Sequence, residues 1–196
     1  MTSSSFAVET ALAADHAATE NLLDLAFGLS RQTKTSYRLR EGNSAVEGLS
    51  FVVREAELRL VGAISFWPLK IGRSGTDALL LGPLAVHPKR QNLGIGLALM
   101  RKGIEKAGSL GHRLIILVGD APYYARVGFK PVPAGLLEMP GPVDPARLLY
   151  LELAAGELDL AEGLVLPPHR HRELSAAFAV PHRREAEQQE AQAQQG

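Results

Sequence analysis

The chain of 196 residues contains no cysteine, which excludes disulfide bonds, thiolate metal sites and a cysteine nucleophile. Basic and acidic residues balance at 21 each, so broad affinity for nucleic acid is not expected. No apolar run approaches the length of a membrane span, and the first residues lack the regions of a signal peptide. These absences predict a cytoplasmic protein that binds neither nucleic acid nor a membrane.

Two common catalytic signatures are also missing. The chain contains neither G-x-x-x-x-G-K-[ST], which binds nucleotide phosphates, nor G-x-S-x-G, which presents a serine nucleophile. Nucleotide hydrolysis and serine esterase chemistry are therefore not favoured. His169 and His171 lie among arginines near the C-terminus, which is typical of a solvated surface. We therefore predict no metal site.

What the chain does contain is the composition of an ordinary globular domain, with 46% hydrophobic and 21% charged residues. Beyond residue 167 the sequence becomes polar and rich in Gln, Glu and Arg, and its end is of low complexity. We predict one domain over residues 1–167 and a polar tail over residues 168–196.

The most informative stretch runs from Leu79 to Gly111 and reads as a buried strand, a basic turn and a long amphipathic helix. Residues 79–86 are almost all apolar, as in a central strand covered on both faces. Gly82-Pro83 interrupts this strand, and because proline cannot donate to a ladder we expect a bulge there. Apolar residues then recur at helical spacing up to Gly111, which suits a left-handed C-terminal cap.

The turn between this strand and this helix has the chemistry of a phosphate site. The first amides of a helix lack internal acceptors and, together with the helix dipole, attract an anion. Gly94 and Gly96 have no Cβ, so a pyrophosphate can approach the amides. Asn92 tolerates the positive φ that such a turn needs. Lys89 and Arg90 add charge that can reach a more distant phosphate.

Two other interpretations of these glycines stay open at this point. Gly94-Ile95-Gly96 begins a dinucleotide-binding fingerprint, but Leu99 occupies the third position, where a small residue is needed for close helix packing. Asp120 follows late for the acid that binds a ribose, and it is expected to cap the next helix. Glycines before a helix can also serve only to permit a turn.

Two motifs together resemble the GNAT family of acetyltransferases. The segment QNLGIG, residues 91–96, follows a strand that ends in LAVHP, residues 84–88, and is similar to the acetyl-CoA signature Q/R-x-x-G-x-G/A. The segment YARVGF, residues 124–129, is similar to the tyrosine and Gly-Phe turn near the end of that fold. The similarity covers about residues 50–155 and resembles a bacterial branch of predicted N-acetyltransferases.

This resemblance implies an α/β (α+β) fold, with a mixed, mostly antiparallel central sheet, splayed central strands and helices on both faces. Trp67-Pro68 is expected to end or bend its strand, and residues 131–145 to form a loop. Residues 28–48 would border the acceptor pocket, although their composition fits a solvated connection equally well. The predicted strands are residues 6–11, 49–54, 57–69, 79–86, 112–118, 129–133 and 147–153, the second and third being joined through residues 55–57.

The resemblance also implies a site for acetyl-CoA as co-substrate. In the family, the diphosphate binds the amides of the turn, and backbone groups of the splayed strand pair with pantetheine and polarise the thioester. Asp120 stands where many members carry an asparagine, which puts any contact from its side chain to CoA in doubt. The residues expected to bind acetyl-CoA are Leu84, Ala85, Val86, Lys89, Arg90, Gln91, Asn92, Leu93, Gly94, Ile95 and Gly96.

Tyr124 is the predicted catalytic residue. By residue type alone it would be a core aromatic, but in the family this tyrosine gives a proton to the departing CoA thiolate. Tyr123 is assigned to packing. The general base is not identified: Asp77, Glu55 and Glu41 are candidates by type only, and each also fits a surface carboxylate.

The sequence thus predicts an N-acetyltransferase that moves an acetyl group from acetyl-CoA to a primary amine of a small molecule or a protein. The amine would attack directly in a ternary complex, and a homodimer is the expected assembly. The alternative is a noncatalytic acyl-CoA sensor or scaffold module, which would need Gly94 and Gly96 but not Tyr124.

Overall fold

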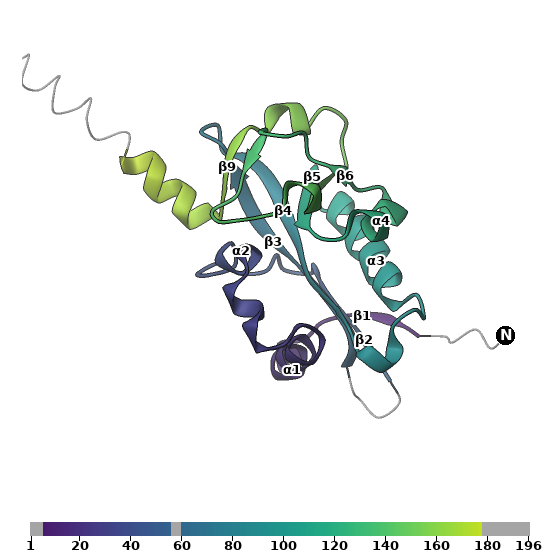
Figure 1. The fold of residues 1–196 in the computed structure, drawn as a ribbon. Coiled ribbons are helices and arrows are strands. Elements are labelled where there is room, and N and C mark those ends of the chain that lie inside the picture. The colour runs from purple at the N-terminus through teal and green to yellow at the C-terminus, as the bar shows by residue number, and fades with distance from the viewer. Residues whose placement is uncertain (1–5, 56–59, 178–196) are drawn as a thin grey trace, which may run out of the picture.

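The computed structural model describes residues 6–55 and 60–177 (Figure 1). Its α-helices are α1 (His16–Phe27), α2 (Thr35–Arg38), α3 (Ile95–Ser109) and α4 (Ala121–Tyr124). Its strands are β1 (Val8–Thr10), β2 (Ser50–Arg54), β3 (Leu60–Ile71), β4 (Thr76–Val86), β5 (Leu114–Val118), β6 (Lys130–Pro131), β7 (Leu137–Glu138), β8 (Leu148–Glu152) and β9 (Gly163–Leu166).

The strands form a mixed sheet in the order β1-β2-β3-β4-β5-β8-β6, with β9 beside the end of β3 and β7 beside β9. Most neighbours are antiparallel, and β4 with β5 and β7 with β9 are the parallel pairs among the described residues. The mostly antiparallel sheet expected from the sequence is therefore confirmed.

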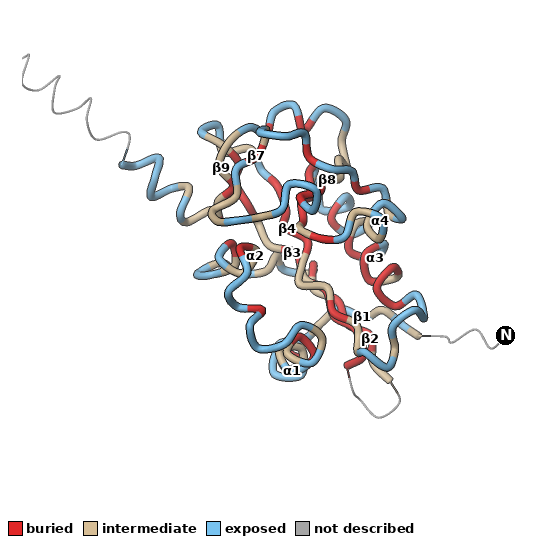
Figure 2. Tube along the Cα trace, in the orientation of Figure 1, coloured by how far each residue is buried: buried red, intermediate tan, exposed pale blue. Residues whose placement is uncertain are grey.

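Helices cover both faces of this sheet, as predicted. On one face, α3 packs against β2, β3 and β4 and buries Leu99 and Met100 against Phe66. On the other face, α1 packs against β3 and β4 and buries Leu22 and Leu23. Figure 2 shows that buried residues follow the sheet and the inner side of α3, while the outer sides of the helices are exposed.

The helix α3 begins and ends as its sequence predicts. Gly94 precedes it with a φ of 85°, and Gly111 follows it with a φ of 84°. Both values lie in the left-handed region that glycine adopts without a steric penalty. Within the helix, Gly103 is buried directly against the ring of Phe66, so a Cβ at this position would overlap that ring.

The predicted bulge in β4 is present at Gly82-Pro83. Leu84 lies opposite Ile64 of β3, and Leu81 lies opposite Phe66. Three steps along β4 therefore match two steps along β3, which is one extra residue in β4. The bulge occupies the only two positions of β4 that the pairing with β3 skips.

The extra residue has two consequences for β4. Leu84 and Val86 pack towards the same core as Leu79 and Leu81, whereas a regular strand would place them on the opposite face. Beyond this, β4 pairs with β5 only at Leu79 and Leu80. The two strands therefore separate towards the end of β4, which confirms the predicted splay.

Of the two outcomes expected at Trp67-Pro68, an end of the strand does not occur, because β3 continues to Ile71. The Pro68 carbonyl accepts a hydrogen bond from the side chain of Asn43 at 2.9 Å. The carbonyl and nitrogen of a strand residue face the same side, so the missing N–H of Pro68 faces away from β4. The ladder between β3 and β4 loses nothing, and the proline is tolerated.

The C-terminal part of the fold also differs from the prediction. Residues 147–153 do not form the last strand, because β9 follows, and β7 forms within the segment expected to be a loop. Both strands are short and pair with partners distant in the sequence, such as Ile71 with Val165. Residues 56 and 57 of the predicted connection and most of the predicted tail lie outside the described residues.

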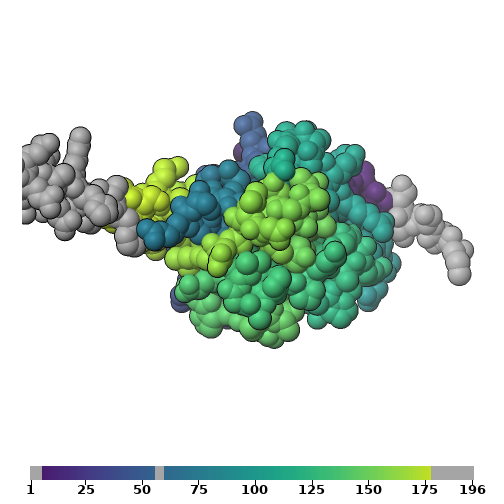
Figure 3. Space-filling view, turned by 90° about the horizontal axis from the view of Figure 1, so that it is seen from above, coloured from purple at the N-terminus to yellow at the C-terminus, as the bar shows by residue number. Residues whose placement is uncertain are grey.

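Residues 168–177 are helical and lie beside the turn between β3 and β4 (Figure 3). The His171 ring nitrogen Nε2 lies 3.0 Å from the Gly72 carbonyl of that turn. The first part of the predicted tail is therefore in contact with the domain. None of the helices in the described part of the chain is long and apolar enough to cross a membrane.

We expect Gly103→Ala and Gly108→Ala to change the stability in opposite directions. Alanine favours a helix over glycine, but at position 103 its Cβ overlaps Phe66, so we expect a loss of about 1–3 kcal/mol. A Cβ at Gly108 of the same helix meets nothing within 4 Å, so we expect a gain of up to about 1 kcal/mol. Urea unfolding measures both, and equal effects would contradict the tight packing at Gly103.

Candidate active site

The turn before α3 presents a row of unpaired backbone amides. Asn92 has a φ of 63°, the positive value that the sequence predicts, and Gly94 follows with a φ of 85°. Within the described residues, no carbonyl or side chain accepts a hydrogen bond from the amides of residues 91–96. Such amides at a helix start attract an anion.

The two glycines of this turn serve different purposes. A Cβ on Gly94 would meet no atom within 4 Å, so the space beside this residue is open, and its left-handed conformation favours glycine. A Cβ on Gly96 would overlap the hydroxyl of Tyr123. Gly96 therefore allows Tyr123 to approach the first turn of α3, in addition to any approach of a ligand.

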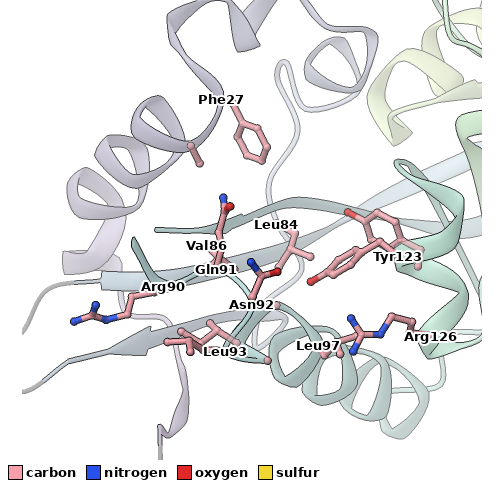
Figure 4. Close-up of a pocket in the computed structure, with 15 residues that line it drawn as sticks. Phe27, Leu84, Val86, Arg90, Gln91, Asn92, Leu93, Leu97, Tyr123 and Arg126 are labelled. Carbon is pink, nitrogen blue, oxygen red and sulfur yellow. The ribbon is translucent and has the colours of Figure 1, made fainter. Parts of the chain in front are cut away.

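A cavity of about 610 Å³ lies along this turn, and we call it the turn cavity (Figure 4). The turn forms one wall, and Phe27 at the end of α1 lies across from it. Strand β4 contributes Leu84 and Val86. The tyrosines of α4 and Arg126 form the end near α3. Sequence elements separated by about a hundred residues thus meet around one space.

A second cavity, of about 970 Å³, lies where β4 separates from β5, and we call it the strand-gap cavity. Its walls come from residues 80–84 of β4, residues 118–120 at the end of β5, and parts of the segments 27–40 and 142–147. The two cavities adjoin, because both are lined by Phe27, Leu84, Gln91, Tyr123 and Tyr124.

The backbone of β4 turns alternate residues towards the gap. Pairs in an antiparallel ladder alternate between hydrogen-bonded and non-hydrogen-bonded, and the amide of His87 donates to the Val61 carbonyl at 2.9 Å. Ala85, two residues earlier, therefore faces β3 with its backbone, while Leu84 and Val86 face the side that β5 has left. Leu84 and Val86 line the turn cavity, whereas Ala85 is buried outside both cavities.

The basic side chains near the turn are not arranged as the sequence predicts. Arg90 lines the turn cavity, but its guanidinium forms an ion pair with Glu55, which raises the pKa of Arg90. In Figure 4 its side chain extends away from Tyr123. Lys89 lines neither cavity. Arg126 lines the turn cavity instead, and its position two residues after Tyr124 gave no signal in the sequence.

Tyr124 is partly buried and lines both cavities. Its ring packs edge-on against Tyr123, with centroids 5.3 Å apart, and against Phe129 at 5.9 Å. Gly119 makes room for it, because a Cβ there would overlap the ring. Burial, followed by the neighbouring Tyr123, raises the pKa of Tyr124 to about 12. The phenol is therefore protonated at neutral pH and able to donate a proton.

Tyr123 has a larger role than the packing assigned to it. It packs partly against the core, as predicted, but it also lines both cavities, with its hydroxyl beside Gly96. Burial raises the pKa of Tyr123 as well. The paired tyrosines in the sequence were a signal, since consecutive aromatic residues after a strand end are unusual, but only the fold shows that both reach the cavities.

The proposed carboxylate bases do not reach the site. Asp77 is exposed and pairs with Lys70 at 2.8 Å, Glu55 pairs with Arg90, and Glu41 is exposed. None of the three lines either cavity. Each is therefore a surface carboxylate by its position, which is the second interpretation that the sequence allowed.

Two other carboxylates, Asp120 and Asp144, line the strand-gap cavity. Asp144 accepts the amide of Ala146 at 3.0 Å. Asp120 occupies the N-cap position of α4, but the capping hydrogen bond expected from its side chain is absent. Throughout residues 6–55 and 60–177, no three His, Asp or Glu side chains gather to hold a metal ion.

Comparison with known proteins gives a family match. Residues 16–129 match the sequence profile described as "Acetyltransferase (GNAT) family". YjhQ, an uncharacterized N-acetyltransferase of Escherichia coli, is 37% identical over 108 residues, which are 54% of this chain and 59% of YjhQ. YhbS of the same organism is 27% identical over 109 residues, 56% of this chain and 64% of YhbS. The chain thus spans less than two thirds of the length of these curated relatives.

Solved structures resemble the chain over a larger part of its length. The crystal structure of Escherichia coli YhbS in complex with CoA has a TM-score of 0.72 and 23% identity, and the match covers 86% of this chain and 92% of YhbS. A GNAT family acetyltransferase from Brucella melitensis, in complex with acetyl-CoA, has a TM-score of 0.56 and 29% identity, with 75% and 96% covered. These similarities establish the fold.

We expect Tyr124→Phe to remove the tyrosine ionisation that occurs at the highest pH. Folding holds this phenol neutral up to a pKa of about 12, whereas an unfolded tyrosine loses its proton near pH 10. The unfolding free energy of the wild type should therefore fall as pH rises from 10 towards 12, by roughly 2–3 kcal/mol in total.

Phenolate absorbance during an alkaline titration measures the ionisation, and urea unfolding at several alkaline pH values measures the stability. Tyr150→Phe, whose ring lies outside both cavities, is the control for loss of a phenol. A high-pH step that persists in Tyr124→Phe would contradict this assignment.

Proposed function

The chain belongs to the acetyltransferase (GNAT) family, and from this membership we propose that it transfers an acetyl group from acetyl-CoA to a primary amine of a small molecule or a protein. The observation that most supports this activity is the row of unpaired amides at residues 91–96, which opens on a cavity that adjoins Tyr124. A homodimer, a cytoplasmic location and a domain boundary at residue 167 stay predictions from the sequence.

The residues of the turn cavity fit the diphosphate of CoA. Backbone amides of residues 91–96 would donate to the phosphate oxygens, the open side of Gly94 gives them space, and Arg126 adds a positive charge. Each hydrogen bond to a charged group contributes roughly 1.5–3 kcal/mol. Three or four of them supply a large part of the roughly 8 kcal/mol of micromolar binding. The structures of relatives with CoA or acetyl-CoA support this assignment.

The separated strand edge fits the rest of the co-substrate. Leu84 and Val86 turn their backbone groups towards the gap left by β5, so they would pair with the amides of pantetheine. A backbone N–H in this position also stabilises the negative charge that develops on the carbonyl oxygen under attack. Ala85 stays among the residues that we assign to this segment, although its own backbone faces β3.

In the proposed reaction the substrate supplies an acetyl thioester, and the amine nitrogen attacks its carbonyl carbon. A C–N bond forms, the C–S bond breaks, and the Tyr124 hydroxyl gives its proton to the departing sulfur. The proton released by the amine leaves through water. Because the pKa of Tyr124 lies far above neutral, the hydroxyl carries its proton when the thiolate departs.

The direct test is release of free CoA thiol from acetyl-CoA in the presence of amino acids, polyamines, aminoglycosides or peptides, with mass spectrometry of the product. We expect amine-dependent thiol release and an acetylated product. Binding of acetyl-CoA without acetylation of any amine would contradict the enzyme and favour an acyl-CoA sensor.

Gly94→Val is expected to abolish CoA binding, because it places a branched side chain in the open space beside the amides and opposes the left-handed φ. Gly94→Asn separates these two effects, since asparagine tolerates the left-handed region, and it should weaken CoA binding less. Gly108→Ala on the same helix is the control. Calorimetry with CoA measures the affinities, and unchanged affinity in Gly94→Val would remove the turn from the site.

Tyr124→Phe is expected to lower kcat by roughly a hundredfold or more, as for loss of a general acid, while CoA affinity changes little. The ring contacts with Tyr123 and Phe129 are retained by phenylalanine, so the fold should persist. Tyr123→Phe is the matched comparison, and we expect it to affect CoA binding more than the chemical step. An unaltered kcat in Tyr124→Phe would exclude it as the proton donor.

A further inference from the structure

Arg40 is a cation in the wall of the strand-gap cavity, and no carboxylate of residues 6–55 and 60–177 forms an ion pair with it. Its guanidinium stacks on the ring of Tyr37, 3.8 Å from the centroid, and lies 5.7 Å from the Trp67 ring. Its Nε donates weakly to the Ser36 carbonyl at 3.4 Å. Burial lowers the pKa of Arg40. This group is thus held away from bulk water without the partner that such a charge normally has.

The neighbouring Arg31 shows the contrast. It lines the same cavity, but it pairs with Glu20 at 2.5 Å and with Asp24 at 2.7 Å. It also donates to the Tyr37 hydroxyl. The charge of Arg31 is therefore neutralised by Glu20 and Asp24. The hydrogen bond from Arg31 to the Tyr37 hydroxyl fixes the ring on which Arg40 stacks.

The terminal nitrogens of Arg40 are hydrogen-bond donors that no described group uses. Among the described residues, Trp67 Nε1 is the only fully covered side-chain nitrogen or oxygen without a hydrogen-bond partner. The terminal nitrogens of Arg40 also make no hydrogen bond within the described residues, so they are open to the cavity that Arg40 lines. A guanidinium presents its donors in a planar fork that matches the two oxygens of a carboxylate.

A group of opposite charge lies on another wall of the same cavity. Asp120 follows β5 and lines the cavity together with Tyr124. Its carboxylate makes no capping hydrogen bond, and it acts electrostatically on Tyr124. The strand-gap cavity therefore has a carboxylate near the proposed proton donor and an unpaired guanidinium on the wall formed by residues 27–40.

We propose that the acceptor is an amino acid or a similar amine that carries a carboxylate, which binds the guanidinium of Arg40 while the amine lies near Tyr124. This inference rests on the proposed function and narrows its substrate class. A guanidinium fork also matches a phosphate, so the experiment includes both groups and a phosphate preference counts against the proposal.

The test uses matched pairs of amines that differ only in the anionic group: lysine with cadaverine, phenylalanine with phenethylamine, and phosphoethanolamine with ethanolamine. We expect the wild type to prefer the carboxylated member. Arg40→Gln should lower kcat/KM for that member by about tenfold to hundredfold, mostly through KM, as for loss of a charged hydrogen-bond pair. Its kcat/KM for the carboxylate-free member should stay within about twofold.

Two variants make the result independent of folding. Arg38→Gln changes an exposed arginine at the end of α2, two residues before Arg40, which bonds the Pro140 carbonyl at 3.2 Å and lines neither cavity, so it should leave both members of each pair unaffected. Arg40→Lys keeps the charge but not the fork, and an intermediate loss is expected. Thermal unfolding of each variant shows whether the fold persists.

Three outcomes would overturn the inference: equal losses for both members of a pair, a wild-type preference for the carboxylate-free amine, or a preference confined to the phosphate pair. Calorimetric titration of the same ligands in the presence of CoA tests the site without turnover. If no amine is acetylated, the proposed function fails. Carboxylate binding that is lost in Arg40→Gln would still support the site, and no binding to the wild type would refute it.

Discussion

The separation of β4 from β5 is the constraint on which the rest of the site depends. One additional residue at Gly82-Pro83 shifts the pairing of β4 with β3 and brings Leu84 and Val86 to the α3 face. Because β5 leaves after two pairs, the backbone of this segment has no strand on that side. Unpaired backbone groups are costly when buried, and here they border a cavity in which a ligand would satisfy them.

Two glycines leave the space in which the two tyrosines of α4 lie. The absence of a Cβ at Gly96 admits the hydroxyl of Tyr123 to the first turn of α3, and the same absence at Gly119 admits the ring of Tyr124 at the end of β5. The two rings contact each other edge-on. Larger residues at either glycine would displace a tyrosine, so these two backbone positions determine where the phenols lie relative to the separated strands.

Local chemistry explains which features could be predicted from the sequence. The bulge follows from a proline without an N–H, the positive φ of Asn92 from its short polar side chain, and the length of α3 from its flanking glycines. Pro68 does not end its strand, because the effect of a proline depends on which edge of the strand its nitrogen faces. The strands β7 and β9 escaped prediction since their pairing is with distant segments.

The site itself was only partly accessible to the same reasoning. The turn and Tyr124 have local motifs, and the structure brings them to adjoining cavities. Phe27, Arg126 and Arg40 belong to other elements, and only the tertiary fold brings them to these walls. The ion pair between Arg90 and Glu55 likewise joins segments that are 35 residues apart, and no local motif predicts it.

The two ends of the site differ in what they are made of. At the turn before α3 the donors are main-chain groups, which every residue type except proline supplies, so most substitutions there leave them in place. The wall formed by residues 27–40 and 142–147 consists of side chains on short helices and loops. Single replacements in these segments can therefore change the shape and charge of this wall while the main-chain donors of the turn remain in place.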